Sequence, residues 1–259
     1  MLVEGKVALV SGVGPGMGRD IAIALAEQGA DIVMGARRSA QMDQVAAEVE
    51  ALGREAVVVR CDITSSDDCA AIVAAARERF GRLDVLVNNA FHGGNGKTLL
   101  DSDLADWRTT MDVNFFGTLA LTQAAVPLLT EQDDSRIVMI NTMSVQNIEA
   151  KFGAYAASKA ALATATRTLA RELGPMGVRV NSIHPGYIWG PSVEWYLNWL
   201  GEQRGITGDD VYRELAGETC LGYLPPSSEI AGTVVYLASS LARPVTGQTI
   251  NTNCGHWFT

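Results

Sequence analysis

The sequence predicts an α/β protein with a doubly wound parallel sheet that carries helices on both faces. Short β-branched apolar runs alternate with alanine-rich segments of helical spacing along the chain. Runs without a polar face are typical of strands that are covered on both sides. Because 259 residues suffice for one large domain, we expect a single domain over residues 1–259.

The expected elements follow from this alternation. The strands are expected at 6–11, 31–36, 55–60, 83–88, 136–141, 178–183 and 248–251. The helices are expected at 18–28, 40–52, 66–80, 105–129, 154–173 and 228–240. Gly29 and Gly53 are expected to end helices, and the polar run 65–68 to begin one. Residues 187–227 break the rhythm, and we interpret them as an insertion within the domain.

Composition argues against several kinds of partner. The net charge is −9, and an acidic surface repels nucleic acids and anionic lipids, so we expect neither a nucleic acid nor a membrane. The four cysteines form no C-x-x-C pair and no metal-ligand spacing with the three histidines. We therefore expect reduced thiols, a cytoplasmic protein and no metal site. The cysteines are Cys61, Cys69, Cys220 and Cys254.

The loop SGVGPGMGR at residues 11–19 raises the question of a phosphate site. It fails the pattern G-x-G-x-x-G in either register, because a methionine or an arginine stands where the third glycine belongs. Its place between a strand and a helix still directs backbone N–H groups at an anion. Gly12 would allow the turn, Gly16 the approach of a pyrophosphate and Gly18 helix–sheet packing. A glycine-rich turn without a ligand is the alternative.

The end of the second expected strand bears on the choice of dinucleotide. Ala36 occupies the position where a carboxylate would bind the ribose hydroxyls of NAD. Arg37 and Arg38 follow, and a guanidinium can bind a 2′-phosphate. We therefore favour NADP(H), with NAD(H) as the other possibility and ordinary solvated arginines as the alternative interpretation. Arg19 is left open between a contact to the 2′-phosphate and a solvent-exposed cap on the first helix.

Tyr155 and Lys159 lie four residues apart in a helical segment, so both project from one face. A neighbouring ammonium favours the phenolate, and we expect Lys159 to lower the pKa of Tyr155. The phenol would then exchange a proton with an alcohol or carbonyl oxygen near neutral pH. A surface lysine below a half-buried tyrosine would show the same spacing.

Several motifs occur together and in order. They are the G-x-x-x-G-x-G loop, NNA at 88–90, VN at 113–114, a hydroxyl residue thirteen positions before Tyr155, Tyr-x-x-x-Lys, and Pro185-Gly186. With this set, the chain resembles the short-chain dehydrogenase/reductase family over nearly its whole length. The resemblance implies a seven-stranded Rossmann-like sheet and NAD(P)-dependent interconversion of a carbonyl and an alcohol. It also implies a homo-oligomer, with a tetramer favoured.

The resemblance assigns roles to individual residues. Tyr155 would be the general acid/base, Lys159 would bind the nicotinamide ribose, and Asn114 would hold a water that connects Lys159 to solvent. Asp62 would meet the adenine and Ile188 the carboxamide. The implied cofactor-binding residues are Gly12, Gly14, Gly16, Met17, Gly18, Arg37, Arg38, Asp62, Ile63, Asn89, Ala90, Tyr155, Lys159, Pro185, Gly186 and Ile188.

Three positions depart from the family pattern. Thr142 stands where a serine usually donates to the substrate oxygen, and Ser144 is the rival, which requires a two-residue shift. Phe91 replaces a glycine beside the nicotinamide groove and is expected to narrow or gate it. Gly190 replaces a threonine that caps the cofactor, so one hydroxyl contact is lost.

The insertion at 187–227 is rich in aromatic residues. The spacing of Trp195 and Trp199, with Tyr196 between them and Trp189 before them, predicts an amphipathic helix that lies over the site as a lid. Such a lid favours a bulky apolar or cyclic substrate. Packing of these aromatics on the domain itself or on another subunit is the alternative.

These observations predict an NADP(H)-dependent oxidoreductase that interconverts a ketone and a secondary alcohol. An NAD-dependent alcohol dehydrogenase and a non-catalytic dinucleotide sensor are the alternatives. An enoyl reductase is disfavoured, because that branch spaces its tyrosine and lysine more widely. We interpret His92 as a loop residue and His184 as structural, and the apolar C-terminal segment 253–259 as an oligomer contact.

Overall fold

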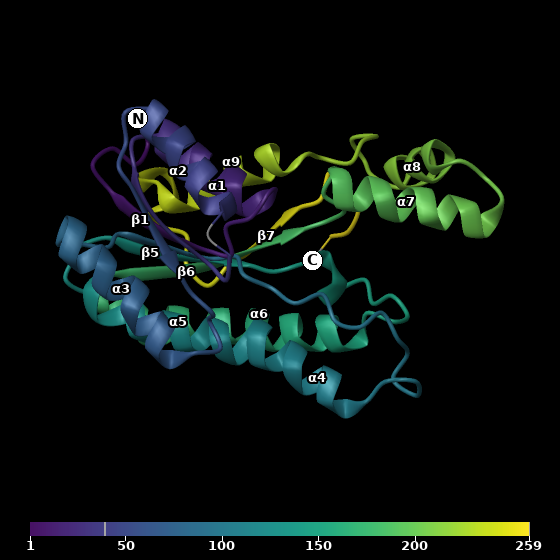
Figure 1. Cartoon of the computed structure of the whole chain (residues 1–259), viewed down its shortest axis with the longest axis horizontal. Coiled ribbons are helices and arrows are strands. Elements are labelled where there is room, and N and C mark those ends of the chain that lie inside the picture. Colours follow the sequence, from purple (N-terminus) through teal and green to yellow (C-terminus); the bar gives the residue numbers. More distant parts are fainter. Residues whose placement is uncertain (39, 259) are drawn as a thin grey trace.

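Seven parallel strands form one sheet in the order β3-β2-β1-β4-β5-β6-β7 (Figure 1). The computed structural model describes residues 1–38 and 40–258. The strands are β1 (Val7–Ser11), β2 (Asp31–Ala36), β3 (Ala56–Arg60), β4 (Val85–Asn88), β5 (Ser135–Ile140), β6 (Val178–Pro185) and β7 (Thr249–Thr252). The strand order reverses between β1 and β4, which is where doubly wound sheets bind ligands. The predicted fold class is confirmed.

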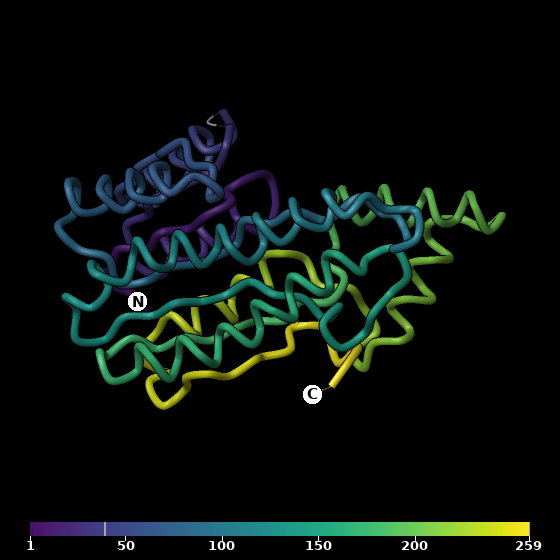
Figure 2. Tube along the Cα trace, turned by 90° about the horizontal axis from the view of Figure 1, so that it is seen from below, coloured from purple at the N-terminus to yellow at the C-terminus, as the bar shows by residue number. Residues whose placement is uncertain are grey.

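Helices cover both faces of the sheet. They are α1 (Met17–Glu27), α2 (Ala40–Ala51), α3 (Ser66–Phe80), α4 (Leu104–Met111), α5 (Thr118–Leu129), α6 (Gly153–Leu173), α7 (Pro191–Arg204), α8 (Gly208–Gly217) and α9 (Ser227–Ala238). Helices α1, α2 and α9 lie on one face, and α3, α5 and α6 on the other (Figure 1). Figure 2 shows α3, α5 and α6 side by side across the second face.

The strands alternate their side chains between two apolar cores. Val10 of β1 packs into the core beneath α1 and α9, together with Ile21 and Leu25. Leu9, its neighbour, faces the opposite core, which contains Leu121 of α5. Because each strand is covered on both faces, the runs read as continuously apolar rather than alternating.

The segment expected to be one helix at 105–129 is three elements. A π-helix, η1 (Asp112–Gly117), separates α4 from α5. At its end a Cβ on Gly117 would lie 2.9 Å from the Ile63 carbonyl oxygen, so η1 packs directly against the loop after β3. A π-helix turn is wider than an α-helix turn and is often found at functional sites. Asn114, which is completely buried, belongs to this turn.

The insertion forms a helical hairpin, α7–α8, which projects beyond the carboxyl end of the sheet (Figure 1). Its apolar residues form a small cluster of their own around Leu197, Val211 and Leu224. The Trp189 N–H donates to the Pro225 carbonyl at 2.8 Å, which joins the two ends of the insertion.

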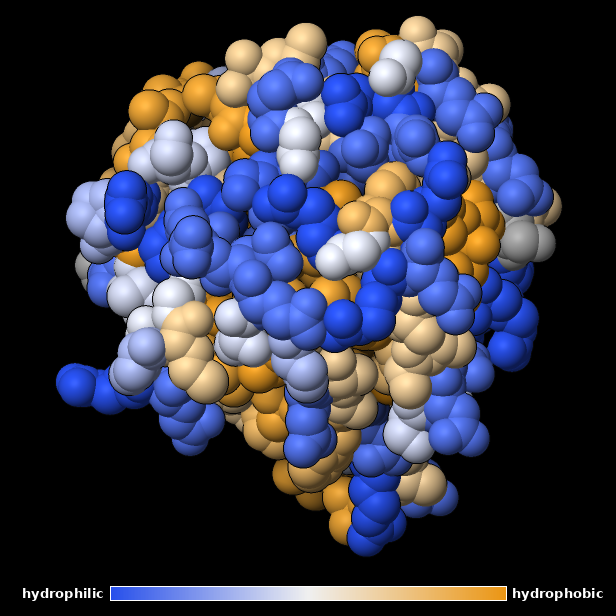
Figure 3. Space-filling model, turned by 90° about the vertical axis from the view of Figure 1, so that its left-hand side faces the viewer, coloured by the Kyte–Doolittle hydropathy of each residue, from blue (hydrophilic) through white to orange (hydrophobic). Residues whose placement is uncertain are grey.

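The surface on the opposite side of the molecule from the hairpin is mainly hydrophilic, with apolar residues in scattered patches (Figure 3). Over residues 1–38 and 40–258, the helices lack the combination of length and apolar character that crossing a membrane requires.

Candidate active site

The glycine loop lies at the carboxyl end of β1, and its glycines are needed for different reasons. Gly12 has a φ of 75°, and a Cβ there would lie 2.5 Å from the Cα of Ala90. A Cβ on Gly18 would collide with the Gly12 carbonyl oxygen. Gly16, at the start of α1, has a φ of 149°, and a Cβ there would meet no atom within 4 Å. The loop is therefore closed on its sheet side and open on its outer side at Gly16.

Two polar side chains hold this loop against the end of β4. The Asn89 amide donates to the carbonyl oxygens of Gly12 at 2.9 Å and Ser11 at 3.2 Å. The Ser11 hydroxyl accepts from the backbone N–H groups of Asn89 at 3.1 Å and Ala90 at 3.3 Å. Asn89 is thus a structural brace as well as part of the cavity wall.

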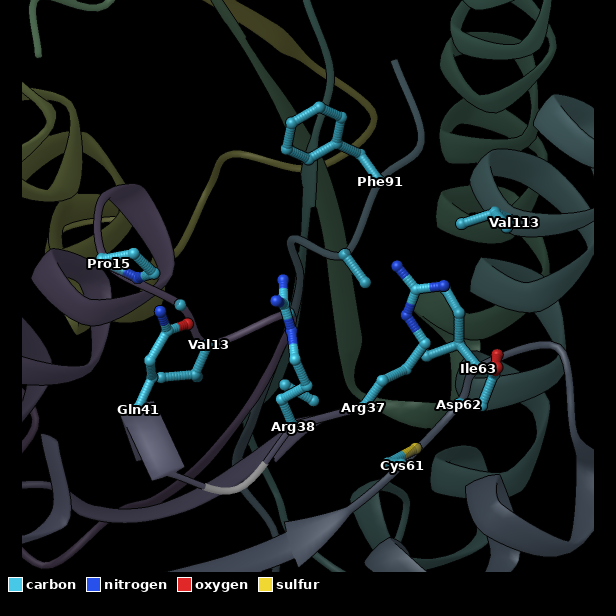
Figure 4. Close-up of a pocket in the computed structure, with 14 residues that line it drawn as sticks. Val13, Pro15, Arg37, Arg38, Gln41, Cys61, Asp62, Ile63, Phe91 and Val113 are labelled. Carbon is cyan, nitrogen blue, oxygen red and sulfur yellow. The ribbon is translucent and has the colours of Figure 1, made fainter. Parts of the chain in front are cut away.

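A cavity of about 210 Å³ opens beside the loop, at the ends of β2 and β3. Ala36 lines it where a carboxylate was considered, and Arg37, Arg38 and Gln41 line the same wall. Figure 4 shows both guanidinium groups directed into this cavity, with Asp62 on its far side. We call it the adenosine-end cavity. It has cationic side chains where a 2′-phosphate would lie.

Asp62 and Arg19 are both held by protein partners. The Asp62 carboxylate accepts from the N–H of Thr64 at 3.0 Å and from its hydroxyl at 2.7 Å, and these bonds, followed by the charges of Arg37 and Arg60, lower the pKa of Asp62. Arg19 forms ion pairs with Glu48 of α2 and with Asp20. Arg19 therefore joins α1 to α2, which is neither of the two roles considered for it.

A second cavity, of about 330 Å³, lies between the glycine loop and α6. Thr142, Tyr155 and Lys159 line one wall. The remaining lining residues include Asn89, Pro185, Gly186 and Ile188, which the sequence placed at the nicotinamide end, and Gly16, Met17, Phe91, Trp189, Gly190 and Ser192. We call it the catalytic cavity.

The surroundings of Tyr155 shift its pKa in the direction opposite to the one expected from Lys159. Burial raises the pKa of Tyr155 to about 12, and a hydrogen bond with Thr142 opposes this shift only in part. Burial likewise lowers the pKa of Lys159 to about 7. The Lys159 ammonium donates to the Ile140 carbonyl at 2.7 Å and lies 5.9 Å from the centre of the Tyr155 ring. Burial thus disfavours the charged form of both side chains.

The structure separates Thr142 from its rival Ser144. Thr142 lies two residues after the end of β5, lines the catalytic cavity with Tyr155 and lies within hydrogen-bonding reach of its phenol. Its hydroxyl donates to the Ser144 hydroxyl and accepts from the Ser144 N–H, both at 3.2 Å. Ser144 is not among the described residues that line the cavity. Ser144 thus holds Thr142 in place.

Asn114 is locked by its neighbours. Its amide donates to the His92 carbonyl and to the Ser158 hydroxyl, both at 2.9 Å, and its oxygen accepts from the His92 N–H at 2.7 Å. These bonds use both N–H groups of the side chain and fix its orientation. The loop around His92 braces the π-helix turn.

His184 lies in the sheet beneath this site. It is buried, and burial, with smaller contributions from Lys159 and Arg167, lowers its pKa to about 4. Its Nδ1 lies 3.4 Å from the Gln146 side-chain oxygen. His184 is therefore a neutral core residue.

The predicted lid is only partly correct. Trp189 lines the catalytic cavity and packs edge-on against Tyr212 at 4.7 Å between ring centres. Trp195 and Trp199 are 68% and 41% exposed, and neither is among the described residues that line the cavity. The i, i+4 pair faces solvent because the opposite face of α7, with Leu197, packs on α8.

Sequence reasoning missed several residues of the site. Ser11, Gln41, Ser158 and Ser192 were not singled out, although each lines a cavity or bonds to a residue that does. Their only sequence signal is position: Ser11 immediately precedes Gly12, and Ser158 immediately precedes Lys159. Serine and glutamine are common on protein surfaces, so type alone gives no signal.

The residues present fit a dinucleotide. The open space beside Gly16 lies at the amino end of α1, where backbone N–H groups and the helix dipole favour a pyrophosphate. On one side lies a cavity with two arginines, and on the other a cavity with Tyr155 and Lys159. The two cavities lie along the same carboxyl edge of the sheet.

Comparison with known proteins agrees with this geometry. The family profile described as Enoyl-(Acyl carrier protein) reductase matches residues 12–256. The 7alpha-hydroxysteroid dehydrogenase of Escherichia coli (strain K12) is 31% identical over 253 residues, covering 98% of this chain and 94% of that protein.

Solved structures are similar over the full length. A short-chain type dehydrogenase/reductase from Mycobacterium marinum has a TM-score of 0.85 and 30% identity, covering 99% of this chain and 97% of that one. Carveol dehydrogenase from Mycobacterium avium in complex with NAD has a TM-score of 0.92 and 27% identity, with 98% of both chains covered.

Proposed function

The chain belongs to the short-chain dehydrogenase/reductase family and is an oxidoreductase acting on CH–OH or C=O groups; from this premise we propose that it reduces ketones to secondary alcohols, reversibly, with NADP(H). The observation that carries the proposal is the catalytic cavity, where the hydroxyls of Tyr155 and Thr142 share one wall with the ammonium of Lys159. When bound, the dinucleotide supplies the hydride in reduction and accepts it in oxidation.

The proton is handled by Tyr155. With a pKa raised to about 12 in the chain without ligand, the phenol is protonated at neutral pH and ready to donate to a carbonyl oxygen. Thr142 donates a second hydrogen bond to the same oxygen and so orients the carbonyl carbon. As the alkoxide forms, Tyr155 transfers its proton. Lys159 and the residues behind it return a proton to the phenolate.

The cofactor preference rests on the adenosine-end cavity. Arg37 and Arg38 both reach into it (Figure 4), and Ala36 places no carboxylate beside them. Charge-assisted bonds from a guanidinium to a phosphate are among the stronger hydrogen bonds in proteins. This supports NADP(H) over NAD(H).

The substrate class follows from the rest of the catalytic cavity. Trp189 and Val193 are among the apolar residues that line it, and apolar walls favour a bulky apolar or cyclic ketone. The relative named as a hydroxysteroid dehydrogenase and the solved carveol dehydrogenase are consistent with such a class. A homotetramer and a cytoplasmic location are further parts of this proposal.

NADPH oxidation with a panel of cyclic, aromatic and linear ketones tests the activity. We expect turnover on at least one bulky cyclic ketone, and the variant Tyr155→Phe should lose about 10²- to 10⁴-fold of it while binding NADPH with similar affinity. Substantial turnover by Tyr155→Phe would refute the assignment of the proton donor. An absence of turnover on the whole panel, with tight NADPH binding, would favour the dinucleotide sensor.

An NAD-dependent alcohol dehydrogenase is the second candidate. The observation in its favour is that the solved carveol dehydrogenase is in complex with NAD. Thermal unfolding with each dinucleotide separates the two, because a ligand that binds only the folded chain raises the unfolding midpoint more, at a given concentration, the more tightly it binds. A larger shift with NADH than with NADPH would replace the first candidate by the second.

A further inference from the structure

The adenosine-end cavity and the catalytic cavity have two lining residues in common, Pro15 and Phe91. Pro15 belongs to the glycine loop and Phe91 to the loop after β4. Figure 4 shows them on opposite sides of the opening. A ligand that extends from Arg38 to Tyr155 therefore passes between these two side chains.

The backbone around Phe91 is fixed, while its side chain is not covered. The N–H of the preceding residue, Ala90, donates to the Ser11 hydroxyl, and the N–H of the following residue, His92, donates to the Asn114 oxygen. The Phe91 ring is nevertheless 63% exposed. Its aromatic neighbour is Tyr155, with ring centres 6.3 Å apart and an interplanar angle of 66°. Rotation of the side chain can thus move the ring without moving the loop.

The exposed ring of Phe91 is apolar surface at the point where the two cavities share their lining. Apolar surface is stabilised when it is removed from water. A ligand that lies between Pro15 and Phe91 offers the ring a surface to cover. Pro15 forms a rigid surface opposite Phe91, because its ring fixes the φ angle of the glycine loop at that position.

We propose that Phe91 is a strap that closes over the bound dinucleotide where it passes from the adenosine-end cavity to the catalytic cavity, and so slows its release. This inference rests on the proposed use of a dinucleotide. The contact adds apolar burial on the bound cofactor only, so its effect falls on the dissociation rate. Because the ring also touches Tyr155, the closed position places it beside the reacting groups.

Stopped-flow fluorescence of NADPH released from the full-length protein tests the strap. Phe91→Ala should release NADPH about tenfold faster than the natural chain, as expected for the loss of a partly buried aromatic ring. Phe91→Tyr keeps the aromatic ring and should release NADPH as slowly as the natural chain. Phe116→Ala is the matched control, because Phe116 is 57% exposed on η1 and is not among the described residues that line either cavity.

The outcomes are distinguishable. Equal release rates for the natural chain and Phe91→Ala would overturn the strap while leaving cofactor binding intact. A rise in KM for ketones with an unchanged release rate would assign Phe91 to the substrate instead, and would also overturn it. If the natural chain binds neither NADPH nor NADH, the proposed function itself fails.

Discussion

The two ends of the cleft lie on one edge of one sheet, yet they are built in opposite ways. At the adenosine end, the charges that we propose to bind the cofactor are the exposed side chains of Arg37 and Arg38, at the end of a strand. At the catalytic end, Lys159 is 2% exposed and Asn114 is completely buried, and both are bonded to protein atoms.

Because of this difference, we expect substitutions at the adenosine end to change cofactor binding with little effect on the free energy of unfolding. Substitutions at the catalytic end should change both activity and the free energy of unfolding. Solvated arginines cost the fold little and can be replaced with small effects on unfolding. A buried ammonium is costly to bury, as its lowered pKa shows. Burying Lys159 at the catalytic end therefore lowers the free energy of unfolding, whereas the exposed arginines at the adenosine end do not.

The largest expected effect comes from Lys159→Met. Turnover should fall by roughly 10²-fold or more. Stability should respond in a pH-dependent way. The unfolded chain keeps this lysine protonated to about pH 10, while the folded chain releases the proton near its pKa of about 7. Unfolding thus takes up a proton between pH 7 and 10, so the free energy of unfolding of the natural chain rises with pH there.

Urea unfolding from pH 6 to 10 measures this slope. Lys159→Met should lack its contribution, whereas Lys97→Met, which changes an exposed lysine, should keep it. The same slope in both variants would show that Lys159 is charged in the folded chain, and the contrast between the two ends would disappear.

The double substitution Arg37→Ser with Arg38→Ser should have an intermediate effect. We expect NADPH to bind about 10- to 100-fold more weakly, from the loss of charge-assisted bonds, with little change for NADH. The free energy of unfolding should stay within about 0.5 kcal/mol. Fluorescence titration with both dinucleotides measures the affinities, and Arg171→Ser, an exposed arginine on α6, is the control. Equal weakening of NADH would argue against a 2′-phosphate site.

The smallest expected effect is tighter dinucleotide binding by the variant Gly190→Thr. Gly190 has an extended φ of 166°, and a Cβ there would meet no atom within 4 Å, so Gly190→Thr should be accepted without strain. The new hydroxyl faces the catalytic cavity and should tighten dinucleotide binding about 3- to 10-fold. Gly190→Ala supplies the Cβ without the hydroxyl. If alanine tightens binding as much as threonine, the hydroxyl contact is not the cause.

Strands and site residues could be predicted because their signals are local. Each expected strand lies within two residues of the observed one, since a strand covered on both faces is a short uninterrupted apolar run. Tyr155 and Lys159 line one cavity, as expected from two side chains four residues apart on one helix face, and their catalytic roles stay predictions. Apolar runs and the i, i+4 spacing can both be recognised without knowledge of the tertiary structure.

What failed depends on contacts between distant segments. The direction of the pKa shift of Tyr155 follows from burial, which spacing does not reveal. The exposure of Trp195 and Trp199 depends on which face of α7 meets α8. The π-helix was missed because it accompanies the close approach of Gly117 to Ile63, a contact that no periodicity records.

That π-helix couples the orientation of Asn114 in the site to the orientation of α5 on the core. Asn114 must face Ser158, and α5, which begins four residues further on, must turn its apolar side, including Leu121, against the sheet. The hydrogen bonds of a π-helix span five residues rather than four, so deleting one residue from 112–117 would change the position of Asn114 relative to α5. We therefore expect natural variation in this segment to substitute residues but to preserve their number.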